Sequence, residues 1–392
     1  MTPLAISGGR VLLNDGWDDT DLLLDAGRIA AIGSTHGAPA IDATGLLVLP
    51  GLVDIHGDAF ERQIQPRPGV DFPASLALAD TEAQLLANGI TTAYLGVTLS
   101  WEPGLRSVEA WRVLLDAMAA HAADAVCDMR VHLRWEACNL DALAMACADI
   151  AAGRVHLLAF NDHTPAILRK VADPVLGAKY ADRAGMALDD FRALAQRIAS
   201  GSDGAQDGIG MIARAARAAG LPMASHDDDS IAARDMFREL GARICEFPMA
   251  EAVAEAARAA GDAVVMGSPN VVRGRSHLGW ASAARLAEAG LCTVLASDYF
   301  YPAMLRAPFI LAARGVLDLA LAWRLVSANP AAACGLADRG IIATGRRADL
   351  LLVAAEAGRP RLVATIAAGR IAWLGAAGWG RVGSGAGAAR MA

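Results

Sequence analysis

The chain has 392 residues, of which 55% are apolar and only 5% aromatic, and its formal net charge is -7. Its length exceeds the roughly 250 residues that a single α/β barrel usually takes. The negative balance argues against general affinity for nucleic acid or anionic membranes, so an anionic small molecule would have to be recognised by a local cluster of arginines. The six cysteines show no CxxC spacing, which predicts free buried thiols.

Both ends of the chain read as short β segments. Residues 4–49 include "LAISGGRVLL" and "DLLLDAGRIAAIG", and residues 340–375 have the same texture. Neither end has enough strands for a stable sheet alone, so we expect residues 1–49 and 338–380 to form one small β-sandwich domain together. Residues 381–392 are rich in Gly and Ala and predict a flexible tail.

The segment between these ends, residues 50–337, alternates short apolar strands with longer helical stretches. Eight such units with no sign of a doubly wound switch predict an α/β fold of the closed (β/α)8 TIM-like barrel type, in which polar residues at the carboxyl ends of strands carry the chemistry. Residues 164–220 are too long for one connection and predict a helical insert near the barrel mouth. The expected strands end near His56, Gly96, Glu136, His163, His226, Phe247, Gly267 and Asp298.

No signal-like segment opens the sequence, and no run of about 20 apolar residues could span a bilayer. We therefore expect a cytoplasmic protein that binds neither membrane nor nucleic acid. The Ala-rich helices leave open whether it is a monomer or a homo-oligomer.

Polar side chains that could bind a metal stand at six positions where predicted strands end. His56 and Asp58 are two residues apart and would point the same way from an extended strand. Any one of the six could instead be a buried side chain bonded to the backbone, or a helix cap. Together, imidazoles and carboxylates without a thiolate suit Zn²⁺ or a harder ion such as Mn²⁺. The six candidates are His56, Asp58, Glu136, His163, His226 and Asp298.

Three segments, "LVLPGLVDIHGD", "SANPAAACGL" and "GIIATGRRADLLLV", resemble the amidohydrolase superfamily from about residue 4 to 375. The resemblance implies a hydrolase with one or two divalent ions, zinc being favoured over manganese, iron or magnesium. It also implies that Asp298 activates the attacking water. The superfamily's first strand usually carries His-x-His, where this chain has His56-Gly57-Asp58. Many members bridge two metals with a modified lysine; Lys170 and Lys179 lie in the predicted insert, so Glu136 is the expected bridging ligand.

A closer resemblance is to the diphosphatases that cleave α-D-ribose 1-methylphosphonate 5-triphosphate to the 5-phosphate and pyrophosphate in phosphonate catabolism. It is carried by "DIHGDAFERQIQPRPGVDFP", "HLRWE", "DHTP", "ASHDD", "MGSPNVVRGRSH" and "ASDY". A triphosphate needs cationic partners, and guanidinium forks bind phosphate oxygens in pairs. Candidate phosphate-binding residues follow the first and seventh strands: Arg62, Arg67, Asn270, Arg273, Arg275 and Ser276. His277 beside them could donate a proton to the leaving oxygen or bind phosphate.

Two other functions fit the same residues. An amide hydrolase acting on an N-acetyl amino sugar phosphate would share the barrel and the metal ligands. A non-catalytic scaffold would keep the barrel alone. The products formed, and whether the purified protein binds metal, distinguish these alternatives.

Overall fold

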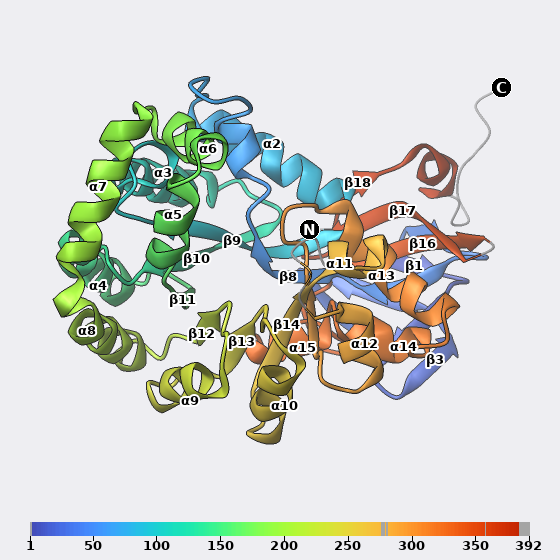
Figure 1. Cartoon of the computed structure of the whole chain (residues 1–392). Coiled ribbons are helices and arrows are strands. Elements are labelled where there is room, and N and C mark those ends of the chain that lie inside the picture. The colour runs from blue at the N-terminus through green and yellow to red at the C-terminus, as the bar shows by residue number, and fades with distance from the viewer. Residues whose placement is uncertain (1, 276–278, 280, 357, 384–392) are drawn as a thin grey trace.

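The computed structural model describes residues 2–275, 279, 281–356 and 358–383. Its largest sheet has eight parallel strands and forms a barrel (Figure 1). The strands follow one another in chain order around the barrel, as repeated βα units require. They are β8 (Leu52–Gly57), β9 (Ile90–Leu99), β10 (Asp128–Glu136), β11 (Leu157–Asn161), β12 (Met223–His226), β13 (Ile244–Glu246), β14 (Ala263–Gly267) and β15 (Val294–Ala296).

The barrel closes where β15 meets β8. The Asp58 amide donates to the Asp298 carbonyl at 3.0 Å, and the Asp298 amide donates to the His56 carbonyl at 2.9 Å. Beneath them, the buried Asp54 carboxylate accepts hydrogen bonds from the Ser297 amide at 3.0 Å and the Ser297 hydroxyl at 2.5 Å. These bonds bring the ends of the first and last strands, and thus His56, Asp58 and Asp298, to one place.

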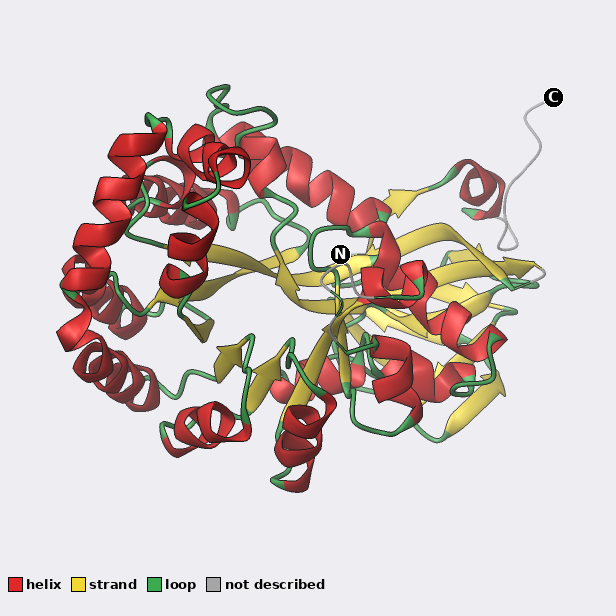
Figure 2. Cartoon of the chain, viewed as in Figure 1, coloured by secondary structure: helices red, strands yellow, loops and turns green. Residues whose placement is uncertain are grey.

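Helices surround the barrel strands on the outside (Figure 2). Successive side chains of each barrel strand point alternately outward and inward. The outward set, including Val131, Leu133 and Cys245, packs under the helices. The inward set, including Ala224 and Ile244, fills the barrel interior. The helices are α1 (Glu61–Ile64), α2 (Ala74–Ala87), α3 (Val108–His121), α4 (Leu143–Ala151), α9 (Ile231–Glu239), α10 (Glu251–Ala259), α11 (Ser268–Arg273), α12 (Ala283–Glu288), α13 (Pro302–Ala313), α14 (Leu319–Arg324) and α15 (Ala328–Ala333).

Four further helices form the insert between β11 and β12: α5 (Thr164–Val171), α6 (Pro174–Ala184), α7 (Leu188–Ser200) and α8 (Ala205–Ala218). The apolar faces of α5, α6 and α7 enclose a small core with Trp101, whose indole N–H donates to the Thr164 hydroxyl at 3.0 Å, whereas α8 packs into the main barrel core. Arg183 of α6 also pairs with Glu102, in the loop after β9. The insert is therefore packed against the loop after β9.

Strands from both chain ends build the second domain, where red C-terminal strands lie beside blue N-terminal ones (Figure 1). One sheet has the order β5-β4-β1-β6 and the other β18-β17-β16-β7-β2-β3. Between them lies a core that includes Ile6, Leu24, Val48 and Leu352. The strands are β1 (Leu4–Ser7), β2 (Arg10–Leu13), β3 (Gly16–Asp19), β4 (Leu22–Asp25), β5 (Arg28–Ile32), β6 (Ala40–Asp42), β7 (Leu47–Pro50), β16 (Leu350–Glu356), β17 (Arg359–Ala367) and β18 (Arg370–Leu374).

The predicted fold class, a (β/α)8 barrel with a β-sandwich domain made by both chain ends, is confirmed. The observed strands end at Glu136, His226 and Gly267 as expected, whereas β9 continues to Leu99. All six cysteines are free thiols as predicted, but only four are buried, since Cys138 and Cys147 are partly exposed. Among the described residues, no helix has the length and apolar character needed to cross a membrane. Of the predicted tail, residues 384–392 lie outside the described residues.

Candidate metal and substrate site

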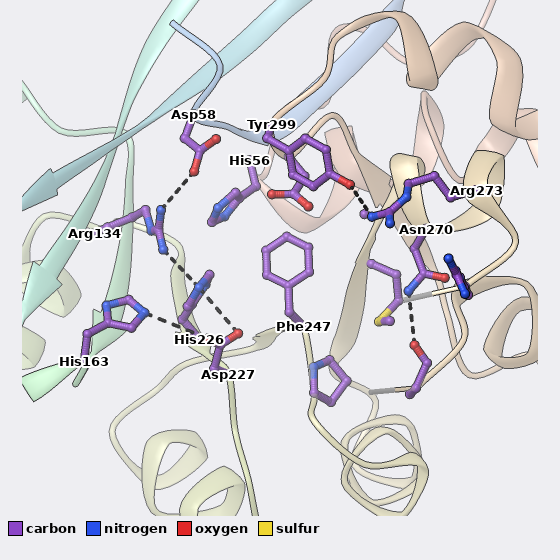
Figure 3. A pocket seen from close by; sticks show the side chains of 16 residues that line it. His56, Asp58, Arg134, His163, His226, Asp227, Phe247, Asn270, Arg273 and Tyr299 are labelled. Atoms are coloured by element: carbon purple, nitrogen blue, oxygen red, sulfur yellow. Dashed lines mark hydrogen bonds and ion pairs between the residues drawn. The ribbon is translucent and has the colours of Figure 1, made fainter. Parts of the chain in front are cut away.

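A pocket opens at the carboxyl ends of the barrel strands, and side chains from distant parts of the sequence converge on it (Figure 3). Ligands bind at this end of (β/α)8 barrels because the βα loops gather there. The lining includes His56, Asp58, Arg134, His163, His226, Asp227, Phe247, Asn270, Arg273, Arg275, Asp298 and Tyr299.

The most buried group of potential metal ligands is formed by His56, His226 and Glu246. The Nδ1 atoms of His56 and His226 lie 3.0 and 3.2 Å from the same Glu246 oxygen, Oε2. The two imidazole rings stack with centroids 5.2 Å apart. One carboxylate and two imidazoles within reach of a common point form a donor set that suits a divalent ion.

The protonation states in this group follow from burial. Burial, together with the nearby charge of Arg134, lowers the pKa of His56 to about 3. Burial also lowers the pKa of His226 and raises the pKa of Glu246 to about 7. Neutral imidazoles are the form that binds metal, and a cation would favour the ionised carboxylate that burial disfavours.

A second group of potential ligands, His163, His226 and Asp227, lies nearer to solvent and shares His226 with the first. Glu136 is buried and contacts His163, its Oε1 lying 2.5 Å from His163 Nδ1. Burial alone would lower the pKa of His163, but Glu136 and Asp227 together raise it to about 9. Glu136 therefore orients His163 and belongs to neither ligand group found among the described residues, so its expected role as a bridging ligand stays a prediction.

Arg134 lines one side of the pocket, between Asp58 and His226 (Figure 3). Its Nη2 donates to His226 Nε2 at 3.0 Å, and its Nη1 is 3.5 Å from Asp58 Oδ2. Gly96 makes room for it, because a Cβ at that position would lie 3.3 Å from Arg134 Cδ and 3.8 Å from His56 Nε2. The missing side chain on β9 thus lets groups from β8 and β10 meet.

Asp298 lines the same pocket, next to His56 and Asp58 through the backbone bonds that close the barrel. Burial, and then the neighbouring charge of Asp58, raises the pKa of Asp298 to about 7. A carboxylate with this proton affinity can accept a proton at neutral pH.

Three pocket residues hold backbone conformations that side chains rarely adopt. Asp227, Phe247 and Asp298 have φ angles of 58°, 52° and 55°, each just after a barrel strand. Such conformations cost of the order of 1–3 kcal/mol each and gather at functional sites. The Phe247 ring lies edge-on to the rings of His56 and His226, with centroid distances of 4.8 and 5.3 Å, and so forms an apolar side of the pocket.

Three of the six candidate phosphate-binding residues line the pocket, namely Asn270, Arg273 and Arg275, and Asn270 and Arg273 lie on the side away from Arg134 (Figure 3). Arg273 and Arg275 are exposed in the lining, and Arg273 Nη1 donates to the Tyr299 hydroxyl at 3.2 Å. Arg62 donates to the Tyr299 carbonyl at 2.7 Å but is not among the lining residues.

Of the remaining predicted residues, Arg67 and Asn270 are described, whereas Ser276 and His277 lie outside the described residues. Arg67 is exposed and also lies outside the described lining. Asn270 lines the pocket, and its side-chain amide donates to the Ala281 carbonyl at 3.2 Å and accepts from the Ala283 amide at 3.1 Å.

The sequence prediction missed Glu246, Arg134, Asp227 and Tyr299. For Arg134 a signal was present, since alternation along "HLRWE" places it on the same face as Glu136. For Glu246 no local signal distinguishes a ligand from the polar end of a short strand.

Residues 47–372 match the amidohydrolase family, and the chain therefore belongs to it and is a metal-dependent hydrolase of that superfamily. Within the family, it is similar to α-D-ribose 1-methylphosphonate 5-triphosphate diphosphatase of Escherichia coli K12. The two are 32% identical over 359 residues, which cover 89% of this chain and 94% of the relative.

Solved structures share the fold at lower identity. N-acetylglucosamine-6-phosphate deacetylase from Pasteurella multocida aligns with a TM-score of 0.62 and 12% identity over 94% of this chain and 98% of the other. Dihydropyrimidinase from Brevibacillus agri aligns with a TM-score of 0.57 and 15% identity over 94% of each chain. At these identities the likeness shows the fold alone.

Proposed function

We propose that the chain hydrolyses a sugar 5-triphosphate, α-D-ribose 1-methylphosphonate 5-triphosphate, to the 5-phosphate and pyrophosphate. The observation that carries this proposal is that one pocket combines metal-ligating groups with cationic side chains, Arg134 among the ligands and Arg273 and Arg275 opposite. An amino sugar phosphate carries a single phosphate and needs cations at one end only, whereas a triphosphate gives a reason for guanidinium groups both beside the metal-ligating groups and opposite them. The similarity to the diphosphatase along nearly the whole chain supports the same substrate.

A divalent ion would be held by His56, His226 and Glu246. Asp58 and the second ligand group, His163, His226 and Asp227, lie beside it. A bound ion would polarise the attacked phosphoryl group and make water more acidic. We propose zinc, with manganese, iron or magnesium as alternatives, because the donors are imidazoles and carboxylates.

Asp298 would act as the proton acceptor for the attacking water, consistent with its raised pKa of about 7. Water attacks the phosphorus next to the sugar, and the bond from that phosphorus to the bridging oxygen breaks. Arg273 and Arg275 would bind the two outer phosphates, which leave as pyrophosphate, and would offset the charge that develops on the leaving oxygen.

The reaction is tested by incubating the metal-reconstituted protein with the sugar triphosphate and following phosphorus products by ³¹P NMR. Pyrophosphate and sugar 5-phosphate in equal amounts are expected. Release of orthophosphate alone would contradict the proposed bond cleavage. If only an N-acetyl amino sugar phosphate were hydrolysed, the amide-hydrolase alternative would replace this function, and a metal-bound protein inactive on both would fit the scaffold.

A further inference from the structure

Phe247, the residue after β13, has a backbone conformation that its own side chain disfavours. Its φ angle of 52° is rare for a bulky residue, and a residue before a proline, here Pro248, ordinarily takes an extended conformation with a negative φ. Asp227 and Asp298 have similar angles, but a short polar side chain tolerates them better. The conformation of Phe247 therefore needs a reason of its own.

Hydrogen bonds on both sides of Phe247 hold this conformation. The Phe247 amide donates to the Val265 carbonyl on β14 at 3.0 Å, and the Asp227 amide donates to the Glu246 carbonyl at 2.9 Å. Strained backbone persists where the surrounding structure fixes it in this way, and such positions are concentrated at functional sites. The strain at Phe247 is thus built into the barrel mouth.

The alternation along β13 shows what the positive φ achieves. Ile244 lies in the interior, Cys245 packs under the helices, and the Glu246 carboxylate reaches His56 inside the barrel. A straight continuation of the strand would point the next side chain outward, towards the helices. The Phe247 ring instead lines the pocket, on the side of the imidazoles that contact Glu246.

The Phe247 ring packs against both imidazoles of the buried ligand group (Figure 3). The planes of the His56 and His226 rings lie at 90° and 80° to it, at the centroid distances of 4.8 and 5.3 Å given above, which is favourable geometry for aromatic pairs. The two imidazoles are nearly parallel, with an interplanar angle of 13°, and both turn Nδ1 towards Glu246 Oε2. One aromatic ring thus contacts both imidazoles that share this carboxylate.

We propose that Phe247 is a positioning residue for the divalent ion, because its ring holds His56 and His226 in the orientation in which they bind the ion together with Glu246. The inference rests on the metal binding in the proposed function but not on its substrate. Groups that orient metal ligands typically contribute about 10–100-fold to affinity, and an apolar shell also limits the access of water. The strained backbone conformation is retained because it places the ring beside the ligands.

The first test measures the Co²⁺ affinity of metal-stripped protein by competition with a chelator, together with the visible spectrum of the bound ion. Phe247→Gly should bind Co²⁺ about tenfold more weakly and change the spectrum, although glycine adopts this backbone conformation most easily. Phe247→Leu, which keeps an apolar side chain, should lose less. Phe72→Gly is the matched control and should bind as the wild type does, since Phe72 is exposed and lies outside the described pocket lining.

The glycine variant separates the ring from the backbone. If Phe247 served only the turn of the chain, Phe247→Gly would bind Co²⁺ at least as tightly as the wild type, with an unchanged spectrum, and that result would overturn the proposal. Weaker binding by Phe247→Gly, combined with a wild type that leaves the sugar triphosphate intact, would disprove the substrate and leave this inference standing.

A second measurement needs no variant. In a crystal structure of the wild-type protein loaded with Zn²⁺, the Phe247 ring should remain against the imidazoles of His56 and His226. A ring turned away from them would reject the proposal even if both Phe247 variants failed to fold.

Discussion

Replacing Glu246 by Gln should stabilise the metal-free protein at alkaline pH while weakening metal binding. Burial raises the pKa of Glu246 from 4.5 to about 7. The folded state therefore binds this proton more tightly than the unfolded state, and wild-type stability falls as the pH rises from about 4.5 to about 7. At about 1.4 kcal/mol for each tenfold change in proton affinity, the ionised carboxylate costs about 3 kcal/mol above pH 7.

Glu246→Gln resembles the protonated side chain and can still accept hydrogen bonds from His56 and His226, so it avoids this cost. Relative to the wild type, its free energy of unfolding should gain about 2–3 kcal/mol between pH 5 and pH 8. Urea unfolding of chelator-treated protein at the two pH values measures this gain. Glu255→Gln, an exposed change on α10, should show none.

The same unfolding experiment is then repeated with Zn²⁺ present. With Zn²⁺ present, the wild type should be stabilised at pH 8 and Glu246→Gln much less, because the variant lacks the charged ligand. The reasoning would be refuted by a variant that loses stability relative to the wild type as the pH rises, or that binds Zn²⁺ as tightly as the wild type does.

Three further changes test other parts of the pocket. Asp298→Asn should lower turnover by about 10²–10⁴-fold while metal content, measured by elemental analysis, stays normal; retained activity would reject its role as proton acceptor. Gly96→Val should crowd Arg134, because its Cβ alone would lie 3.3 Å from Arg134 Cδ, so activity should fall with little change in the circular dichroism spectrum, and an equally active variant would contradict the need for that gap. Arg273→Gln should raise KM for the triphosphate at least tenfold without altering metal affinity, whereas Tyr299→Phe, which removes one hydrogen bond to Arg273, should have a smaller effect in the same direction.

The sequence predicted the fold because each βα unit carries its own local signal. Strand ends are local features too, so His56, His226 and Asp298 could be placed at the mouth before the structure was known. Which side chains share an ion is not local, because it depends on how far each strand is shifted against its neighbours. Glu136 stands at a strand end as expected. Its carboxylate, however, contacts His163, which follows the next strand, and does not join the group of His56, His226 and Glu246.

Glu246 is a potential ligand that the sequence did not reveal, for the same reason. Its strand has only three residues, and nothing in "RICEF" distinguishes a metal ligand from the polar end of any short strand. Only closure of the barrel brings it to 3.0 Å from His56, which lies 190 positions away in the sequence.

The positions of the two buried charges suggest why this pocket suits a polyphosphate. Glu246 is fully buried outside the pocket lining, where an ion bound with His56 and His226 would neutralise it, whereas Arg134 lines the pocket and is held by Asp58 and His226. A cation at Glu246 would share His226 with Arg134, and the two positive charges would repel each other in a site of low dielectric. An anionic phosphoryl group between them relieves that repulsion and binds to both. An uncharged amide group at the same place would gain less from the two cations, which is a further argument for the proposed phosphoric anhydride hydrolysis.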